Sequence, residues 1–287
     1  MLQDLSFGRL ENEFRTISPA ATDTALCFQG DRILLQRAPD NTLCLPTCEQ
    51  VSQWRHLHNW CSWEQDSFRY AFRMQDQNFF LWMGEAGTGD TPFSYESVRQ
   101  LRQLVSKEIC FAIMTGWHLF SWYRANRFCG RCGTPTVHDH LERMVRCPSC
   151  GNLIFPKICP AVIVAVTDGD RLLLSKYAGR SYTRYALIAG YTEIGETIEQ
   201  TVHREVMEEV GLKVKNLRYY KSQPWGVDGN VLMGFYCDLD GSDTIHLDRT
   251  ELALAEWHHR SSLPAEDDGI SLTREMIRIF SENREPK

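Results

Sequence analysis

Three glutamates are concentrated in the short segment REVMEEVG, Arg204–Gly211. Glu205, Glu208 and Glu209 are spaced i, i+3 and i+4, so a helix would place all three carboxylates on one side. Like charges at this spacing destabilise an isolated helix by about 0.2–0.5 kcal/mol. A salt-bridged surface helix would normally carry Lys or Arg four residues after a glutamate, but position 209 is another glutamate and position 212 is Leu212. Divalent cations neutralise carboxylates and take their oxygens as ligands, so the pattern favours a metal site.

The flanking residues predict where this helix begins, how it packs and where it ends. Thr197 is a suitable N-cap, Gln200 completes a capping box, and Gly211 is suited to end the helix. Glu205 and Glu209 project beside an apolar stripe, where an unpaired charge is costly or is forced to protonate. The residues of this stripe, which we expect to be buried, are Ile198, Val202, Val206 and Val210.

Two pairs of cysteines form a second candidate metal site. The segments FCGRCG and RCPSCG give a CxxC–x14–CxxC arrangement, a spacing that suits zinc. Because sulfur fills all four positions, the zinc should be structural; a redox dithiol or an iron–sulfur cluster is the alternative. His138 and His140 in the intervening loop are expected to be surface residues, not ligands. The four predicted zinc ligands are Cys129, Cys132, Cys147 and Cys150.

The remaining composition is that of a soluble globular protein. The chain has 287 residues, enough for two domains, with 43% apolar and 24% charged residues. Its formal charge of −6 argues against a protein built mainly to grip nucleic acid. The start, MLQDLSFGRLENEF, lacks the pattern of a secretory signal, and the run ICFAIMTGWHLF is too short and too polar to span a bilayer. We therefore expect a cytoplasmic protein with no membrane partner.

Seven of the eleven cysteines lie outside the two pairs, which indicates free thiols in a reducing compartment. Cys44 and Cys48, in CLPTC, are a possible further metal site, but two unrelated thiols is the favoured interpretation. From position 124 to 157 the chain holds six basic and two acidic residues, a local charge of +4. Such a face can contact RNA or a phosphate-rich ligand, and a merely solvated face is the alternative.

Two segments suggest an internal repeat. TALCFQGDRILLQRA, from Thr24, and AVIVAVTDGDRLLLSKY, from Ala161, both predict a pair of strands around a tight turn and share GDR followed by three aliphatic residues. This is consistent with an N-terminal half that is a decayed duplicate, although such hairpins are common. No glutamate cluster follows the first copy, so it should be catalytically silent. The periodicity also predicts a helix within residues 94–127 and an amphipathic helix over 271–283.

The glutamate segment resembles the Nudix hydrolase family. Gly190, Glu196 and the run from Arg204 to Leu212 fill the signature GX5EX7REUXEEXGU over 23 residues without a mismatch. The family hydrolyses nucleoside diphosphates linked to another moiety, with magnesium or manganese bound at this loop–helix–loop. The resemblance implies that Glu205, Glu208, Glu209, Glu251 and the carbonyl of Ala189 are ligands of Mg²⁺ or Mn²⁺.

The cysteine pairs before the signature and the sequence SQPW after it, Ser222–Trp225, narrow the resemblance to the NADH pyrophosphatase subfamily, from about Arg127 to the end of the chain. It implies an α+β chain of three parts: an N-terminal, non-catalytic α/β domain over 1–125, a zinc ribbon over 126–157, and a Nudix domain over 158–287. The Nudix domain should be an α/β/α sandwich with a mixed sheet, and the protein a homodimer.

The sequence departs from the subfamily where the motif SQPWPFPxS reads SQPWGVDGN. We expect this loop to be looser and one charge more negative, which bears on selectivity for nicotinamide. An aromatic residue after the signature glycine stacks on a base in relatives, and Tyr191 has that position. The substrate-binding residues that the resemblance implies are Phe155, Tyr191, Gln223, Pro224, Trp225, Asn230 and Thr273.

A mechanism follows from the charges. Metal ions on the three glutamates would screen the negative charge of two linked phosphates and acidify a water. Arg204 can hold one carboxylate by a charge-assisted hydrogen bond, and a further carboxylate, Glu251 or alternatively Glu256, can order the water or take its proton. NADH would then give AMP and the mononucleotide of nicotinamide, and NAD caps on RNA would be open to the same reaction. A Nudix enzyme for another dinucleotide or a nucleoside diphosphate sugar is the first alternative. A zinc-ribbon module that only senses nucleotide is the second, against which the intact glutamates argue.

Overall fold

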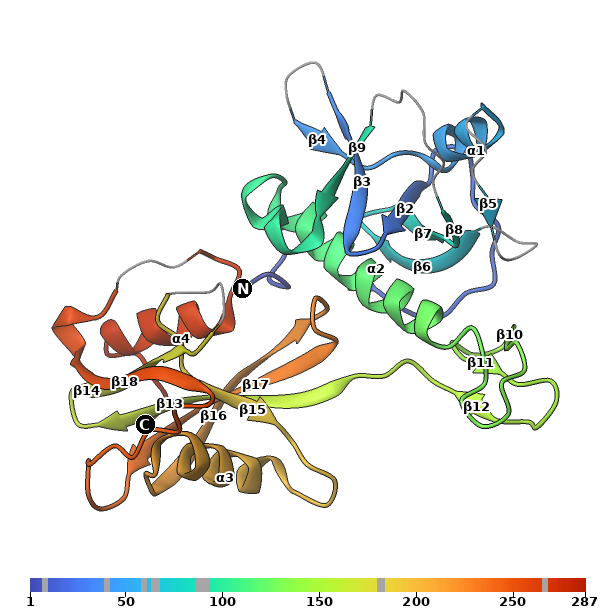
Figure 1. The fold of residues 1–287 in the computed structure, drawn as a ribbon. Helices are drawn as coiled ribbons and strands as arrows, with labels where there is room; N and C mark the ends of the chain where they lie inside the picture. The colour runs from blue at the N-terminus through green and yellow to red at the C-terminus, as the bar shows by residue number, and fades with distance from the viewer. Residues whose placement is uncertain are drawn as a thin grey trace. The chain divides into compact units, whose positions relative to one another are not determined.

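The computed structural model describes residues 1–6, 10–38, 42–57, 61–62, 68–85, 93–179, 184–264 and 268–287. The chain divides into two compact units. One unit, which we call the catalytic unit, contains residues 1–3, 158–225 and 230–287; the other, the N-terminal unit, contains residues 4–157 and 226–229. Figure 1 shows the elements of both units in the colours of the chain.

The catalytic unit is built on one mixed sheet. Its strands follow the order β16-β17-β13-β14-β18, and β15 also pairs with β13. The pairing of β13 with β17 is parallel and the others are antiparallel. The elements are β13 (Cys159–Asp168), β14 (Arg171–Tyr177), β15 (Ile188–Tyr191), α3 (Ile198–Val210), β16 (Val214–Trp225), β17 (Asn230–Leu239), β18 (Leu252–His259), a 3-10 turn (Arg260–Ser262) and α4 (Leu272–Ser281).

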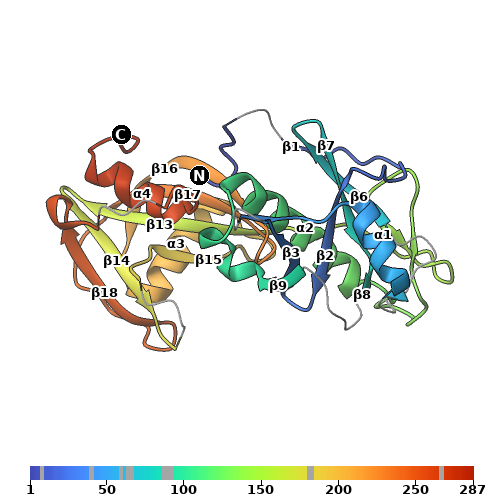
Figure 2. The same ribbon diagram turned by 90° about the horizontal axis from the view of Figure 1, so that it is seen from above.

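Alternate residues of β13 pack on opposite faces of this sheet, as side chains of a strand must. Val162 and Val164 belong to the apolar cluster that contains the valines of α3, whereas Ile163 and Ala165 belong to the cluster that contains the apolar face of α4. Accordingly, α3 and α4 lie on opposite sides of the sheet in Figures 1 and 2. The predicted α/β/α sandwich with a mixed sheet is confirmed.

The N-terminal unit contains a second sheet, with the strand order β1-β6-β7-β2-β3-β4 and β9 paired to β3. The elements are β1 (Leu10–Glu11), β2 (Thr24–Gln29), β3 (Arg32–Arg37), β4 (Leu43–Cys44), α1 (Cys48–Leu57), β5 (Cys61–Ser62), β6 (Phe68–Met74), β7 (Gln77–Trp82), β8 (Gly84–Glu85), β9 (Phe93–Ser97), a 3-10 helix (Val98–Gln103) and α2 (Lys107–Ala125). The ribbon follows as the three-stranded sheet β10 (Val137–His138), β11 (Val145–Arg146) and β12 (Leu153–Ile154).

The two large sheets share their pattern of pairing. In each sheet, the first strand of the hairpin that contains GDR pairs in parallel with another strand: β2 with β7, and β13 with β17. That other strand is in turn the second strand of an antiparallel pair, β6 with β7 and β16 with β17. Even the cap of the following helix is repeated: Thr47 and Gln50 exchange the same two hydrogen bonds, 2.8 and 3.2 Å, as Thr197 and Gln200. This correspondence supports the duplication suggested by the sequence.

Both predicted hairpins and the terminal helix are present, but the helix predicted within residues 94–127 is only partly correct. Residues 93–97 form β9, which pairs with β3 over Arg32–Gln36. The helix α2 begins only after Ser106, whose hydroxyl accepts a hydrogen bond from the amide of Ile109 at 3.3 Å. None of the described helices has the length and hydropathy needed to cross a bilayer.

Candidate active site

The glutamate helix α3 begins and ends where the sequence predicts. Thr197 and Gln200 form the capping box, and Gly211 ends the helix with a left-handed φ of 69°. The valines of the stripe are fully buried against the sheet, and Ile198 is partly buried beside them. The caps and the buried stripe of α3 therefore determine the direction in which its remaining side chains project.

The three glutamates do not have equal surroundings. Glu205 and Glu209 are buried, with exposures of 8% and 3%, whereas the side chain of Glu208 is 58% exposed. Burial raises the pKa of Glu205 against the opposing effect of Arg204, and the negative charges of Glu208 and Glu251 raise it further. A cation placed beside Glu205 would therefore be stabilised by charge that the fold has already concentrated there.

Arg204 holds two of these carboxylates. Its Nη1 atom donates to Glu205 Oε1 at 2.7 Å and to Glu208 Oε2 at 2.9 Å, and its Nη2 donates to the carbonyl oxygen of Tyr191 at 2.8 Å. The sequence argument expected Arg204 to hold one carboxylate; the residue also lies four places before Glu208 and bonds to it as well as to Glu205. One guanidinium relieves part of the repulsion on α3.

Glu196, the isolated glutamate of the signature, is the functional residue that the sequence argument left without a role. Arg204 donates to both of its oxygens, from Nε at 2.6 Å and from Nη2 at 2.9 Å. This pairing, with the amide of Glu193 and the hydroxyl of Thr201, lowers the pKa of Glu196 to about 2. The sequence signal for this role was the position of Glu196 in the signature, eight residues before Arg204.

The packing around position 190 explains why the signature has a glycine there. A Cβ atom at this position would lie 1.9 Å from Cδ of Glu205, a distance at which the carboxylate could not stay. The side chain of Glu205 therefore lies directly against β15, next to Ala189, whose carbonyl was predicted as a ligand. Carboxylate and carbonyl oxygens are the donors that Mg²⁺ and Mn²⁺ prefer, so the residues present fit such an ion. Among the described residues, however, only the ribbon cysteines bring three ligand atoms within 4.8 Å of one another.

The two candidates for the extra carboxylate differ in their contacts. Glu256 on β18 accepts hydrogen bonds from Tyr185 at 2.5 Å and shares one with His258 at 2.9 Å. Glu251 is exposed, precedes β18, and lies close enough to Glu205 to raise its pKa. These contacts favour Glu251 over Glu256.

Two of the predicted substrate-binding residues are bonded to each other. The hydroxyl of Tyr191 donates to Oδ1 of Asn230 at 3.0 Å, and the Tyr191 side chain remains 51% exposed. Its backbone carbonyl is the one that Arg204 holds. The residue is thus fixed through its hydroxyl and its carbonyl, and half of its surface remains exposed.

Gln223 makes its hydrogen bonds inside the catalytic unit, and its contact with substrate stays a prediction. It is fully buried; its Nε2 donates to the carbonyl of Ile270 at 2.6 Å, and its Oε1 accepts from the amide of Leu272 at 2.9 Å. These bonds fix the start of α4, where Thr273 lies half-buried in the first turn. Pro224 is exposed and Trp225 is half-buried at the end of β16.

The altered motif forms a tight turn, Gly226–Gly229, that groups with the N-terminal unit. The looser loop stays a prediction, although Gly226 is buried and a Cβ atom there would lie 2.2 Å from the carbonyl oxygen of Met114 in α2. The expected extra negative charge is also offset, since Arg99 pairs with Asp228 at 2.8 Å.

The ribbon cysteines form a compact cluster. Their Sγ atoms lie within 4.8 Å of one another, with separations of 3.4 Å between Cys132 and Cys147 and 3.6 Å between Cys129 and Cys150. Sulfurs on the corners of a tetrahedron around zinc are about 3.8 Å apart. Both knuckles have the same form: Gly133 and Gly151 have φ of 73° and 70°, and the first sulfur of each knuckle accepts a backbone amide at 3.4 Å. The residues therefore fit a structural zinc ion.

Neither histidine of the ribbon joins this cluster, as expected. His140 is exposed, but His138 is not the surface residue that we predicted: it is half-buried, and its Nε2 shares a hydrogen bond with the hydroxyl of Tyr123 at 2.8 Å. Cys44 and Cys48 belong to no metal-ligand cluster within the described part of the chain. Phe155 is 54% exposed and belongs to the N-terminal unit, so its contact with substrate stays a prediction.

A capped glutamate helix on this mixed sheet, together with a four-cysteine ribbon, defines the class as a Nudix hydrolase with a zinc ribbon. The model of the NUDIX domain matches residues 157–278, and that of the NADH pyrophosphatase zinc ribbon domain matches residues 124–155. The NAD-capped RNA hydrolase NudC of Pasteurella multocida (strain Pm70) is 39% identical over 180 residues, which cover 62% of this chain and 67% of that protein. The protein of the same name from Erwinia tasmaniensis is 35% identical over 201 residues, 68% of this chain and 76% of that protein. The chain belongs to the NADH pyrophosphatase subfamily of the Nudix hydrolases.

Proposed function

We propose that this protein hydrolyses the pyrophosphate bond of NAD(H), giving AMP and nicotinamide mononucleotide, and that it removes NAD caps from RNA by the same reaction. The observation that carries the proposal is the complete glutamate helix with the Glu205 carboxylate seated against Gly190, in a chain similar to NAD-capped RNA hydrolases. The intact site argues against a module that only senses nucleotide.

The reaction forms one P–O bond from water to a phosphorus atom and breaks the bond from that phosphorus to the bridging oxygen, which leaves with the other mononucleotide. Glu205, Glu208, Glu209 and the carbonyl of Ala189 would hold Mg²⁺ or Mn²⁺, which would supply charge screening and a more acidic water. Arg204 orients the carboxylates and ties the loop before α3 to the helix. We assign to Glu251 the acceptance of the proton from water, because its charge acts on Glu205 and Glu256 is bonded to Tyr185.

The substrate is held, in this proposal, by the exposed face of Tyr191 against a base, with Asn230, Pro224 and Trp225 nearby in sequence. Gln223 acts by fixing the start of α4 and thereby Thr273. Following the resemblance, we also propose a cytoplasmic homodimer, which size-exclusion chromatography with light scattering tests directly.

A second function has one observation in its favour. The motif reads SQPWGVDGN where the subfamily has SQPWPFPxS, so a different dinucleotide or a nucleoside diphosphate sugar is the competing substrate class. The test is hydrolysis by the purified full chain with magnesium or manganese of NADH, NAD, ADP-ribose, dinucleoside polyphosphates and NAD-capped RNA. NADH or NAD-capped RNA should have the highest kcat/KM. A clear preference for another substrate would replace this assignment, and inactivity on all would remove it.

A further inference from the structure

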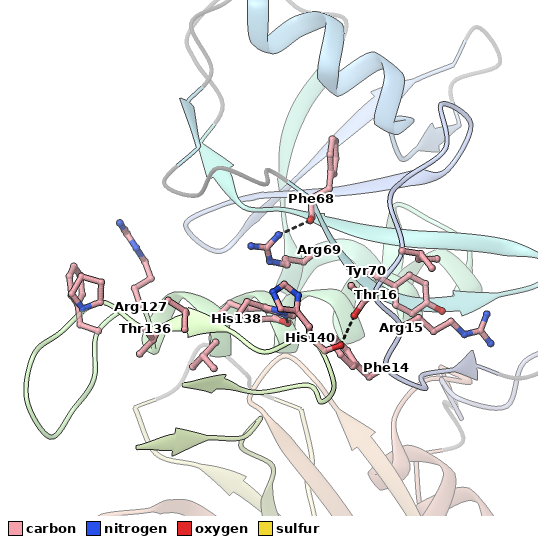
Figure 3. Close-up of a pocket in the computed structure, with 16 residues that line it drawn as sticks. Phe14, Arg15, Thr16, Phe68, Arg69, Tyr70, Arg127, Thr136, His138 and His140 are labelled. Carbon is pink, nitrogen blue, oxygen red and sulfur yellow. Dashed lines mark hydrogen bonds between the residues drawn. The ribbon is translucent and has the colours of Figure 1, made fainter. Parts of the chain in front are cut away.

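The N-terminal unit contains a cavity of about 620 Å³. Its wall is formed by three parts of that unit: the segment 14–17 between β1 and β2, the start of β6, and the ribbon with the end of α2 (Figure 3). The volume is within the range of about 300–1,000 Å³ typical of small-molecule sites. The cavity therefore exists only where the ribbon packs on the N-terminal sheet.

The wall of this cavity is positively charged in a chain whose net charge is −6. Arg15, Arg69 and Arg127 line it, and none of the described lining residues is acidic. Arg15 is paired with Glu11 at 3.3 Å and with Glu13 at 3.5 Å, and Arg69 Nη1 donates to the carbonyl of Phe68 at 3.1 Å. Guanidinium groups favour phosphate and carboxylate, so the charge selects an anion.

The same wall offers flat rings. His138 lies between Phe14 and Tyr123, with ring centroids 5.7 and 5.6 Å away. Burial, with the nearby charge of Arg69, lowers the pKa of His138 to about 4, so the imidazole is neutral at physiological pH. Phe128, 57% exposed, also lines the cavity. Aromatic rings beside arginines form the surface on which nucleic-acid bases stack.

A buried hydroxyl at the cavity gives an independent indication of a ligand. Tyr70 lines the cavity and is only 5% exposed, yet its hydroxyl has no hydrogen-bond partner among the described residues. A buried polar group without a partner destabilises the folded protein. A ligand oxygen or nitrogen that accepted this hydrogen would remove the penalty.

We propose that this cavity binds one nucleotide unit, with its phosphate against the arginines and its base against the exposed ring of Phe128. The unit has two possible sources, a free mononucleotide or one residue of a single-stranded RNA. The RNA source would rest on and deepen the proposed removal of NAD caps, because it would give the protein a hold on the transcript apart from the cap. Binding of a free nucleotide would not depend on that function.

Fluorescence anisotropy of the full-length protein tests the proposal, with a short 3′-labelled RNA that carries a 5′-monophosphate as the probe. This RNA has no pyrophosphate bond, and no magnesium or manganese is added, so catalysis does not enter. Arg127→Gln and Phe128→Ala change exposed residues and should each weaken binding about five- to tenfold. Arg127→Gln should also reduce the salt slope of log K by about 0.7. The matched controls are Arg124→Gln and Leu141→Ala, exposed residues outside the cavity wall, with an expected change below about twofold.

Tyr70→Phe separates a binding role from a purely structural one. Loss of the hydroxyl should leave the melting temperature unchanged or raise it, because the free protein loses an unsatisfied buried group, and should weaken binding. Zinc content and thermal melting verify that every variant is folded. Competition by AMP distinguishes the sources: displacement of the RNA indicates a site for free nucleotide, and binding of RNA without displacement indicates an RNA residue.

No binding of either probe by the wild-type protein, or equal weakening by the cavity variants and their controls, would overturn the proposal. Hydrolysis of NADH by the wild-type protein is measured separately, so that failure of the proposed activity is not confused with failure of this cavity.

Discussion

The carboxyl group of Glu205 occupies the space in which any other residue at position 190 would place its Cβ atom. The glycine and the glutamate of the signature are therefore required together, although fourteen residues lie between them in the sequence. Gly190→Ala must displace the carboxylate, and we expect a fall in kcat/KM of about a hundredfold or more, because small misplacements of catalytic groups have such costs. Steady-state hydrolysis of NADH measures it. Gly130→Ala, at a glycine with open space around it, is the control; equal activity of the two variants would contradict this account.

Glu209→Gln should nearly abolish turnover and leave the fold intact. The substitution keeps the size of a buried side chain and removes a charge that a divalent cation needs as a ligand. Hydrolysis at saturating magnesium, together with thermal melting, provides the measurement. Glu199→Gln, in the exposed first turn of the same helix, should retain activity. Turnover by Glu209→Gln within about threefold of wild type would rule out the metal site.

The pairing of Glu196 with Arg204 predicts a dependence of stability on acid pH. The pKa of Glu196 is about 2 in the folded protein, below the value of about 4.3 expected for an unfolded glutamate. A lowered folded pKa gives a stabilisation that is present above pH 4.3 and is lost as the pH falls toward 2. Urea unfolding between pH 5 and 2.5 should show a shallower decline for Glu196→Gln than for wild type. Parallel curves would show that this pair does not contribute.

The ribbon should contain about one zinc per chain. Cys129→Ser or Cys147→Ser should lower zinc content and stability, since thiolate–zinc bonds contribute folding free energy. Elemental analysis and thermal melting test both effects, and Cys159→Ser, outside the cluster, is the control. A zinc-free protein whose four ribbon thiols all react under native conditions would exclude the assignment.

The packing of the turn Gly226–Gly229 changes the effect that we expect from restoring the subfamily motif. Introducing PFP at positions 226–228 should not simply tighten NADH binding, because atoms at Cβ of residue 226 meet the Met114 carbonyl. We expect Gly226→Ala to destabilise the protein by about 1–3 kcal/mol through overpacking, as measured by urea unfolding. Asp228→Asn, whose charge is already paired, should change KM for NADH by less than about twofold. A selective, larger fall in KM for NADH over ADP-ribose would restore the original interpretation of the loop.

How far the sequence predicted the site depends on whether the signal was local. The caps at Thr197 and Gly211 depend on residues within one turn of the helix, and both are correct. The burial of Glu205 and Glu209 followed from helical periodicity alone.

The errors concern contacts between distant parts of the chain. Residues 93–97 form a strand because β3, some sixty residues earlier, offers an open edge, and no local pattern reveals that partner. The same holds for Gly226 against Met114 and for Gln223 against Ile270. Their places in a motif predicted a looser loop at Gly226 and a substrate contact at Gln223, but packing across the fold determines the surroundings of both residues.

Arg204 has a consequence for how the protein survives chelation. It bonds to Tyr191 at the end of β15 and to Glu196 on the loop, and also to Glu205 and Glu208 on the helix. These bonds hold the catalytic segment in its conformation without a metal ion. We therefore expect a divalent cation to bind to this segment, and a chelator to remove it, without refolding. Among the described residues, no side chain replaces zinc between the ribbon cysteines in this way. We therefore expect a chelator that removes the catalytic cation to leave the fold intact, and one that removes zinc to unfold the ribbon.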